Sequence, residues 1–116
     1  MGQMIYKILT IEADAQLQRD ASLTPAGTDA ADGYVHFSDA AQLETTLDTH
    51  FLGHDDLMIL AVDTAACGAA LRWEPSRDGM LFPHLYKPLK EDMVGARFML
   101  NAARDGLSAF LNGAAA

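Results

Sequence analysis

Short apolar runs separated by polar breaks dominate the chain, and this pattern predicts strands more often than helices. Runs of about four to eight apolar, aromatic or β-branched residues between turn formers are typical of strands. By this criterion we expect strands at residues 4–9, 33–38, 57–62, 71–74, 80–82 and 93–100. The run at 57–62, Leu-Met-Ile-Leu-Ala-Val, has no polar side chain and predicts a strand buried on both faces.

Three other segments have the spacing of helices. Thr10 precedes a short helical pattern that starts with acidic residues and runs to about Arg19. Ser38 is a natural N-cap before apolar residues that recur every fourth position as far as Phe51. The alanine-rich residues 102–111 predict a helix near the C-terminus.

The connections between these elements carry their own signals. Residues 22–33 hold few large apolar side chains and predict a loop, and a loop of about a dozen residues suggests a functional role. Asp78-Gly79 lies between two apolar runs and predicts a β-hairpin. Pro83 and Pro88 predict that the segment between them is irregular or lies at a sheet edge.

The order of the elements indicates an α+β fold. Two strand–helix steps are followed mainly by strands in succession, which favours α+β over a doubly wound parallel sheet. A chain of 116 residues falls within the size of one domain, and no repeat or linker divides it. We therefore expect a single domain over residues 1–116.

Composition excludes several classes of protein. Sixteen acidic against eight basic residues give a formal net charge of −8, which argues against binding long nucleic acid. No apolar run approaches the roughly 18 residues of a membrane span, so no membrane partner is expected. The single cysteine, Cys67, excludes a disulfide framework and a cysteine-rich zinc site. With no export signal, these features lead us to expect a cytoplasmic protein.

Two histidines are candidates for chemistry. Alternation along residues 33–38 places His36 on the strand face opposite Val35 and Phe37. His36 also precedes an expected helix N-terminus, a place where an anion binds favourably. Its position within a strand favours the other interpretation, a structural histidine that is hydrogen-bonded within the core. His84 shares a strand face with Tyr86, and a structural role in the loop is its default interpretation.

The first arm of the hairpin is also polar. Arg72 and Glu74 fall on one strand face, with Trp73 on the other. The spacing favours a structural ion pair between Arg72 and Glu74, and the alternative is an anion clamp beside a general acid. Trp73 belongs either to the core, which is favoured, or to a platform on which a ligand stacks.

The sequence contains no complete motif of a known catalytic or metal site. His50 and His54 have the spacing of a helical zinc pair, but Gly53 interrupts the helix and no third ligand is nearby, so we expect no metal site. The chain has no glycine-rich dinucleotide motif, no P-loop and no Gly-x-Ser-x-Gly.

Three segments, taken together, resemble a known family. They are Ile-Tyr-Lys-Ile at 5–8, Asp-Gly-Tyr-Val-His-Phe-Ser at 32–38, and Leu-Arg-Trp-Glu-Pro at 71–75 with Leu-Phe-Pro-His-Leu-Tyr-Lys-Pro-Leu at 81–89. In this order they resemble the small bacterial proteins of the domain of unknown function 952 family. The resemblance covers residues 4–98, and the family name carries no activity.

A more distant resemblance is to the ADP-ribosyltransferase-like fold, nearest the RNA 2′-phosphotransferases that use NAD. Val-His-Phe-Ser at 35–38 matches their second motif, 57–62 their buried strand, and Asp78-Gly79-Met80 falls at their third motif. At their first motif, Tyr6-Lys7 stands where those enzymes have a histidine. The resemblance implies two small, mostly antiparallel sheets that form a cleft, with flanking helices.

The same resemblance implies that NAD binds as a substrate and suggests roles for particular residues. It places His36 at a ribose hydroxyl, Lys7 and Arg72 at the pyrophosphate, and Glu74 or His84 as the nearest acid or base. The catalytic candidates are His36, Glu74 and His84. The nucleotide-binding candidates are Tyr6, Lys7, Tyr34, His36, Ser38, Arg72, Trp73 and Tyr86, of which Tyr34, Trp73 and Tyr86 would stack on nicotinamide or adenine. We expect the polar candidates to converge on one cleft.

The sequence leaves two classes of function open. The first is an enzyme that transfers or hydrolyses ADP-ribose from NAD or a related nucleotide. The second is a non-catalytic module that binds a nucleotide or another phosphorylated small molecule. Lys7 in place of a histidine and Met80 in place of a glutamate weaken catalysis by the familiar route more than they weaken binding.

Overall fold

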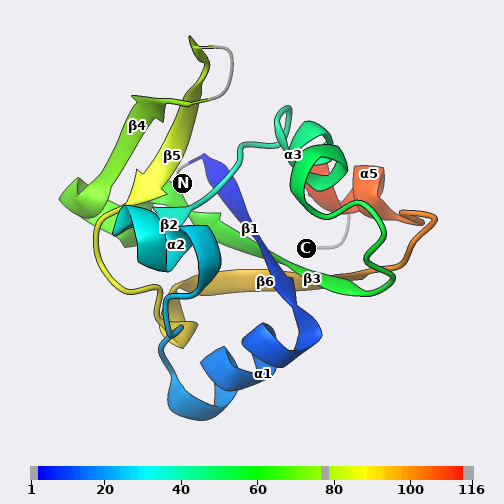
Figure 1. Cartoon of the computed structure of the whole chain (residues 1–116), viewed down its shortest axis with the longest axis horizontal. Coiled ribbons are helices and arrows are strands. Elements are labelled where there is room, and N and C mark those ends of the chain that lie inside the picture. Colours follow the sequence, from blue (N-terminus) through cyan, green and yellow to red (C-terminus); the bar gives the residue numbers. More distant parts are fainter. Residues whose placement is uncertain (1–2, 77–78, 114–116) are drawn as a thin grey trace.

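Two three-stranded antiparallel sheets form the framework of the molecule (Figure 1). The computed structural model of the chain describes residues 3–76 and 79–113. The first sheet has the order β1-β3-β6, and the second has the order β2-β5-β4. The strands are β1 (Met4–Thr10), β2 (Val35–His36), β3 (Leu57–Asp63), β4 (Leu71–Pro75), β5 (Leu81–Leu85) and β6 (Val94–Leu100). The expected α+β class with two small antiparallel sheets is confirmed.

The first sheet separates two apolar cores. Its central strand β3 is the continuous apolar run that predicted a fully buried strand, and its side chains alternate between the two faces. Ile5, Leu60 and Val62 pack on the face toward the second sheet. Ile8 and Ile59 pack on the opposite face, against helices.

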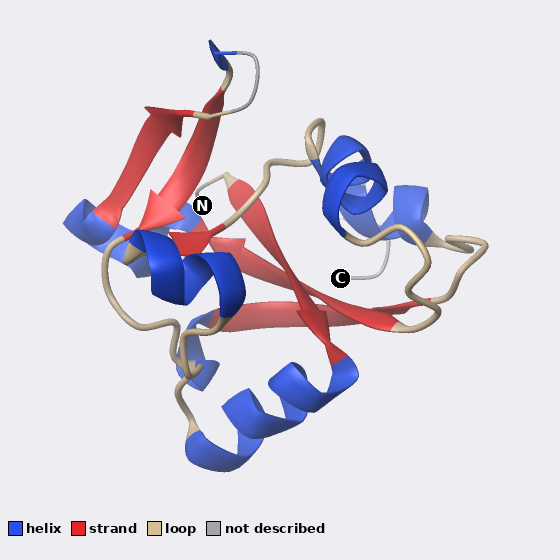
Figure 2. Ribbon diagram, in the orientation of Figure 1, coloured by secondary structure: helices blue, strands red, loops and turns tan. Residues whose placement is uncertain are grey.

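Helices cover both faces of the first sheet (Figure 2). The helices are α1 (Ile11–Asp20), α2 (Gly27–Asp32), α3 (Leu43–His50), α4 (Thr64–Cys67) and α5 (Leu107–Leu111), with 3₁₀ turns η1 (Gly68–Ala70) and η3 (Glu91–Met93). Thr10 caps α1 as predicted, because its hydroxyl accepts a hydrogen bond from Ala13 N at 3.1 Å. Leu17 of α1 packs in the core shared with the second sheet, whereas α3 and α5 pack in the other core. Within residues 3–76 and 79–113, no helix is long and apolar enough to cross a membrane.

The second sheet is built on the predicted hairpin. Strands β4 and β5 pair so that Arg72 lies opposite His84 and Glu74 lies opposite Phe82. The expectation that the segment between Pro83 and Pro88 is irregular or at an edge is wrong for His84 and Leu85, because they belong to β5, the central strand of its sheet. Tyr86 and Lys87 lie beyond the strand in an irregular segment, as expected. Strand β2 is only two residues long, and Phe37 N donates to Pro83 O at 3.0 Å just beyond it. A proline is tolerated there because the pairing ends where its missing N–H would have been needed.

A backbone bridge between β1 and the segment after β2 joins the two sheets. Tyr6 of β1 and Ser38, just after β2, exchange two backbone hydrogen bonds of 2.8 and 2.9 Å. The expected strand at 33–38 is thus reduced to β2 and this bridge. Because the bridge ties β1 to the end of β2, Lys7 is held close to His36.

Three predicted elements differ from the observed ones. The expected loop at 22–33 contains α2, a helix without a large apolar residue and therefore without a helical pattern. The helix expected from Ser38 begins at Leu43, because Ser38 Oγ bonds to Thr46 Oγ1 at 2.9 Å and does not cap the helix. The C-terminal helix expected over 102–111 covers only 107–111, because Gly106 before it adopts a left-handed backbone with φ of 80°.

Candidate functional site

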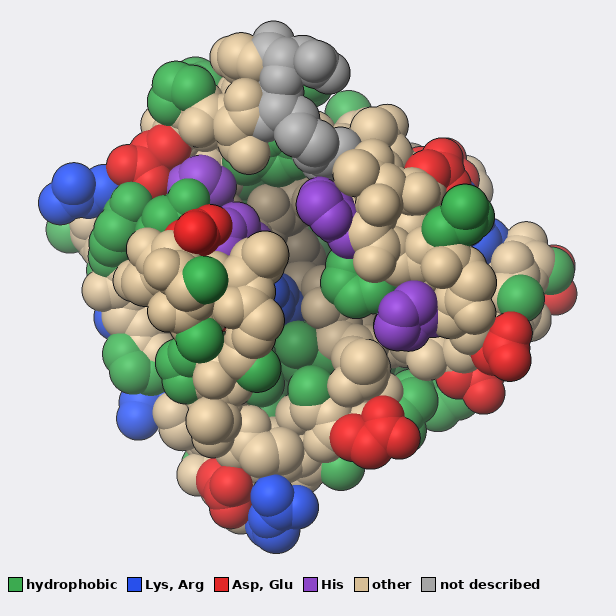
Figure 3. All heavy atoms as spheres, in the orientation of Figure 1, with side chains coloured by type: hydrophobic (Ala, Val, Ile, Leu, Met, Phe, Trp, Pro, Cys, Tyr) green, Lys and Arg blue, Asp and Glu red, His purple; other side chains and the backbone are tan. Residues whose placement is uncertain are grey.

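A pocket of about 490 Å³ opens where the two sheets meet. Its floor comes from β1, and its walls come from α2, the end of β2, α3 and the hairpin. The lining residues are Tyr6, Lys7, Ile8, Thr28, Asp32, His36, Phe37, Ser38, Thr46, His50, Phe51, Ser76, Phe82 and His84. Figure 3 shows the hollow in the middle of this face, with histidine side chains around it.

A buried ion pair lies at the floor of this pocket. Lys7 is 8% exposed and its Nζ lies 2.8 Å from Asp29 Oδ2 of α2, a residue that is 7% exposed. The same ammonium donates to His36 O at 3.0 Å. Burial lowers the pKa of Lys7, against the opposing effect of the Asp29 charge and hydrogen bond. Burial alone would raise the pKa of Asp29, but hydrogen bonds from His36 and the charge of Lys7 outweigh it and hold that pKa below its ordinary value.

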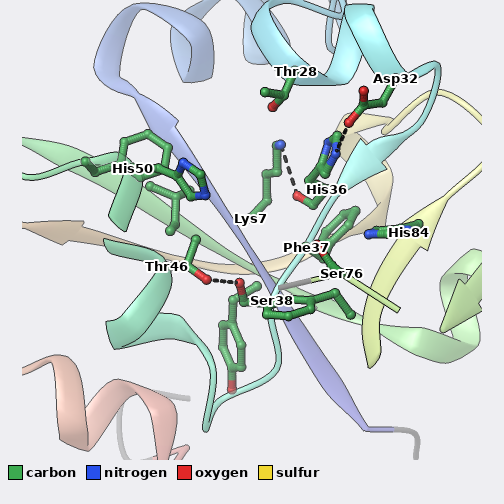
Figure 4. Close-up of a pocket in the computed structure, with 14 residues that line it drawn as sticks. Lys7, Thr28, Asp32, His36, Phe37, Ser38, Thr46, His50, Ser76 and His84 are labelled. Carbon is green, nitrogen blue, oxygen red and sulfur yellow. Dashed lines mark hydrogen bonds and ion pairs between the residues drawn. The ribbon is translucent and has the colours of Figure 1, made fainter. Parts of the chain in front are cut away.

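His36 is held between two carboxylates of α2. Its Nδ1 lies 2.6 Å from Asp29 Oδ1, and its Nε2 lies 2.9 Å from Asp32 Oδ2. The backbone N of His36 also donates to Asp29 Oδ1 at 3.0 Å. The orientation of His36 is therefore fixed from both sides, and Figure 4 shows the contact with Asp32.

Helix α2 depends on these polar contacts for its position. Its six residues, Gly-Thr-Asp-Ala-Ala-Asp, include one buried side chain, that of Asp29. Gly27, its first residue, and Gly33, which follows it, have left-handed backbone angles φ of 56° and 83°. Since α2 buries no large apolar side chain, Asp29 and Asp32 supply its main side-chain attachment to the strands.

A second carboxylate orients His84. Glu74 Oε1 lies 2.9 Å from His84 Nδ1, and it also accepts a hydrogen bond from Tyr86 OH at 2.6 Å. These hydrogen bonds, that of Tyr86 first, lower the pKa of Glu74, and the bond to Glu74 raises the pKa of Tyr86. His84 is buried and lines the pocket. Among the contacts of residues 3–76 and 79–113, Nδ1 is engaged by Glu74, and Nε2 is the ring nitrogen left for a ligand.

Aromatic contacts join the two histidines. The ring of Tyr34 stacks on His84 with centroids 4.2 Å apart and lies 4.5 Å from the ring of His36. The ring centroids of Tyr34 and Tyr86 are 5.1 Å apart, and the Arg72 guanidinium lies 5.1 Å from the centroid of the Tyr86 ring. This stacked aromatic cluster continues the pocket wall along the face of the second sheet.

The structure brings most of the predicted site residues together. Five of them line the pocket: Tyr6, Lys7, His36, Ser38 and His84. Four others form a cluster beside the pocket. Tyr34 and Glu74 contact the histidines, Tyr86 donates a hydrogen bond to Glu74, and Arg72 lies over the ring of Tyr86.

Two expectations about the hairpin are not met. Trp73 points to the face of β4 opposite Arg72 and Glu74 and is not part of the pocket wall, so the expected convergence does not include it. The favoured ion pair between Arg72 and Glu74 is also wrong, because Glu74 pairs with His84 and Arg72 lies over Tyr86.

Sequence reasoning missed residues on two walls of the pocket. Thr28 and Asp32, with Asp29 behind them as the partner of Lys7, lie in the segment expected to be a loop, whose unusual length was the only signal. Thr46 and His50 line the opposite wall from α3. His50 has the spacing of a metal pair with His54, and no other pattern in the sequence indicates that it lines a pocket.

The ion pair predicts a loss of stability in acid. In the folded protein the pKa of Asp29 is lower than its ordinary value of 3.8. The contribution of the Asp29 carboxylate to the free energy of unfolding is therefore complete at pH values above 3.8, and it is lost as the pH falls from 3.8 through the lower pKa of the folded protein. We expect the free energy of unfolding, measured by urea titration, to fall steeply below about pH 4. Asp29→Asn should flatten this fall. An unchanged pH dependence in the variant would assign the acid transition to other carboxylates.

Comparisons with known proteins agree on one relationship. A family model described as "Protein of unknown function (DUF952)" matches residues 8–96. The crystal structure of protein CC0527 from Caulobacter crescentus, a structural genomics target, is similar with a TM-score of 0.88 and 34% identity, covering 95% of this chain and 99% of that chain. The solution NMR structure of CC0527 is similar with a TM-score of 0.76 and 35% identity, covering 87% and 89%. No curated protein matches the chain.

Proposed function

The chain belongs to the DUF952 family, and we propose that its pocket binds NAD or a related nucleotide and that the protein transfers or hydrolyses the ADP-ribosyl group. The observation that carries this proposal is the lining of the pocket. It combines a buried ammonium, that of Lys7, with a histidine, His84, whose Nδ1 is held by a carboxylate.

Size and polarity support a small-molecule ligand. A pocket of about 490 Å³ is within the usual range of roughly 300–1,000 Å³ for such sites. Its wall mixes aromatic side chains with hydroxyls and histidines, as expected for a ligand with rings, ribose hydroxyls and phosphates. The two small antiparallel sheets that border it are also the arrangement that the resemblance to the ADP-ribosyltransferase-like fold implies, which further supports the proposal.

The charges around the pocket differ between its two sides. Asp32, with Glu74 behind His84, makes the α2 and hairpin side rich in carboxylates next to aromatic rings. Such surroundings favour a cation, and the nicotinamide ring of NAD is a pyridinium cation. Lys7 lies at the floor with two of its three N–H donors used by Asp29 and His36 within the described residues, so one donor is left for an anion.

The proposed reaction starts with cleavage of the bond between nicotinamide and ribose. The bonding electron pair passes to the pyridinium nitrogen, so nicotinamide leaves neutral and needs no proton. The ribose C1′ becomes oxocarbenium-like, and a water or an acceptor hydroxyl adds to it in the same step, so that removal of its proton assists the release of nicotinamide. His84 Nε2 accepts the proton that the incoming oxygen loses, while Glu74 stabilises the imidazolium through Nδ1.

Thermal shift and nicotinamide release together test this function. At about 100 times its dissociation constant, a ligand should add about 2.7 kcal/mol to the free energy of unfolding. We expect NAD and ADP-ribose to raise the melting temperature and NAD to release nicotinamide in the presence of the protein. A shift without release would instead support the non-catalytic binding module. The absence of a shift with NAD, ADP-ribose and nicotinamide would refute both.

A further inference from the structure

His50 differs from the other two histidines of the pocket. His36 is engaged by Asp29 and Asp32, and His84 is engaged by Glu74. Within residues 3–76 and 79–113, no hydrogen bond or ion pair engages the ring of His50, although it lines the pocket. A polar ring that lines a pocket without an internal partner is available to a ligand.

The position of His50 complements that of Lys7. It lies at the end of α3, on the wall opposite α2, and Figure 4 shows Lys7 between His50 on one side and His36 with Asp32 on the other. The carboxylates that contact Lys7 and His36 are both on α2. The α3 side of the pocket is therefore the side on which an anion meets the least repulsion.

From this placement we infer that His50 and the remaining N–H donor of Lys7 bind the phosphate groups of the ligand. This inference rests on the proposed function and deepens it, because it divides the pocket into a phosphate subsite beside α3 and a subsite for the ring of the base beside α2. Histidine and lysine both donate charge-assisted hydrogen bonds to phosphate oxygens. His50 is then a specificity-determining residue that favours phosphorylated ligands over nucleosides.

Substitution of His50 tests the inference, and the chain supplies a matched control. In His50→Gln, we expect ADP-ribose and inorganic pyrophosphate to bind about 5- to 10-fold more weakly, as for the loss of one hydrogen bond to a charged group. His54 lies four residues later and is not part of the pocket wall. His54→Gln should bind both probes like the wild type. Because His50 and His54 are both exposed, neither substitution should change the melting temperature of the free protein.

The probes separate failure of this inference from failure of the proposed function. Wild-type affinity for ADP-ribose in His50→Gln would overturn the phosphate subsite and leave the proposed function standing. An equal loss of affinity for adenosine, which has no phosphate, would also overturn it, because His50 would then shape the pocket as a whole. Binding of pyrophosphate that depends on His50, without binding of ADP-ribose, would support the subsite and overturn the proposed function. If the wild type binds neither probe, both fail.

Discussion

Replacing Asp29 with alanine is expected to lower the free energy of unfolding by about 3–5 kcal/mol, the usual cost of leaving a buried charge without its partner. Asp29 accepts hydrogen bonds from the Lys7 ammonium and from both the ring and the backbone of His36. Its removal leaves the Lys7 ammonium buried with one carbonyl partner, and it also releases α2 from the floor of the pocket. Chemical denaturation with matched urea titrations measures the loss.

Asp32→Ala is the matched control for this prediction. Asp32 lies on the same helix and contacts the same histidine, but 47% of its side chain is exposed. An exposed pair contributes about 0–1 kcal/mol, so this variant should unfold close to the wild type. The double variant Lys7→Met with Asp29→Ala should recover part of the stability, since it leaves no buried ammonium. Equal, small effects of the two single variants would contradict a special role for the buried pair.

The second large effect is expected at His84. His84→Asn keeps a donor near the position of Nδ1 for Glu74 but removes Nε2. If Nε2 accepts the proton in the reaction, nicotinamide release should slow by about 10²- to 10⁴-fold with little change in KM. Steady-state rates with NAD, over a pH series, measure this directly.

Arg72→Gln is the matched control, because Arg72 lies opposite His84 on the neighbouring strand. Arg72 lies over the ring of Tyr86 and does not line the pocket. The rate of this variant should stay within a few-fold of the wild type. A His84→Asn protein that folds, binds NAD and releases nicotinamide at the wild-type rate would refute the role of His84 as the base.

Much of the framework could be predicted because local signals and packing agree. The continuous apolar run of β3 has only one stable location, the centre of a sheet covered on both faces. The Asp-Gly pair correctly predicted the pairing of β4 with β5, and Thr10 correctly predicted the start of α1. Alternation around His36 correctly separated it from its apolar neighbours, which lie in the core.

The errors fall where distant contacts override local patterns. Helix α2 has no apolar stripe, and its polar attachment to Lys7 and His36 is not visible before the chain folds. Pro83 is compatible with a central strand only because β2 is so short, which depends on the bridge between Tyr6 and Ser38. The choice of His84 over Arg72 as the partner of Glu74 likewise depends on cross-strand geometry that spacing alone leaves open.

The most direct test of the central claim is an NMR titration of the ¹⁵N-labelled protein with ADP-ribose. If the nucleotide binds between the two sheets, the largest changes in amide chemical shift should occur at Lys7, at residues 36–38 and at residues 46–50, with small changes around α5. Changes confined to residues 52–57 and 100–104, at the smaller hollow between α3 and the end of β6, would place the ligand elsewhere. That result, or an unchanged spectrum at saturating ADP-ribose, would contradict the proposed site.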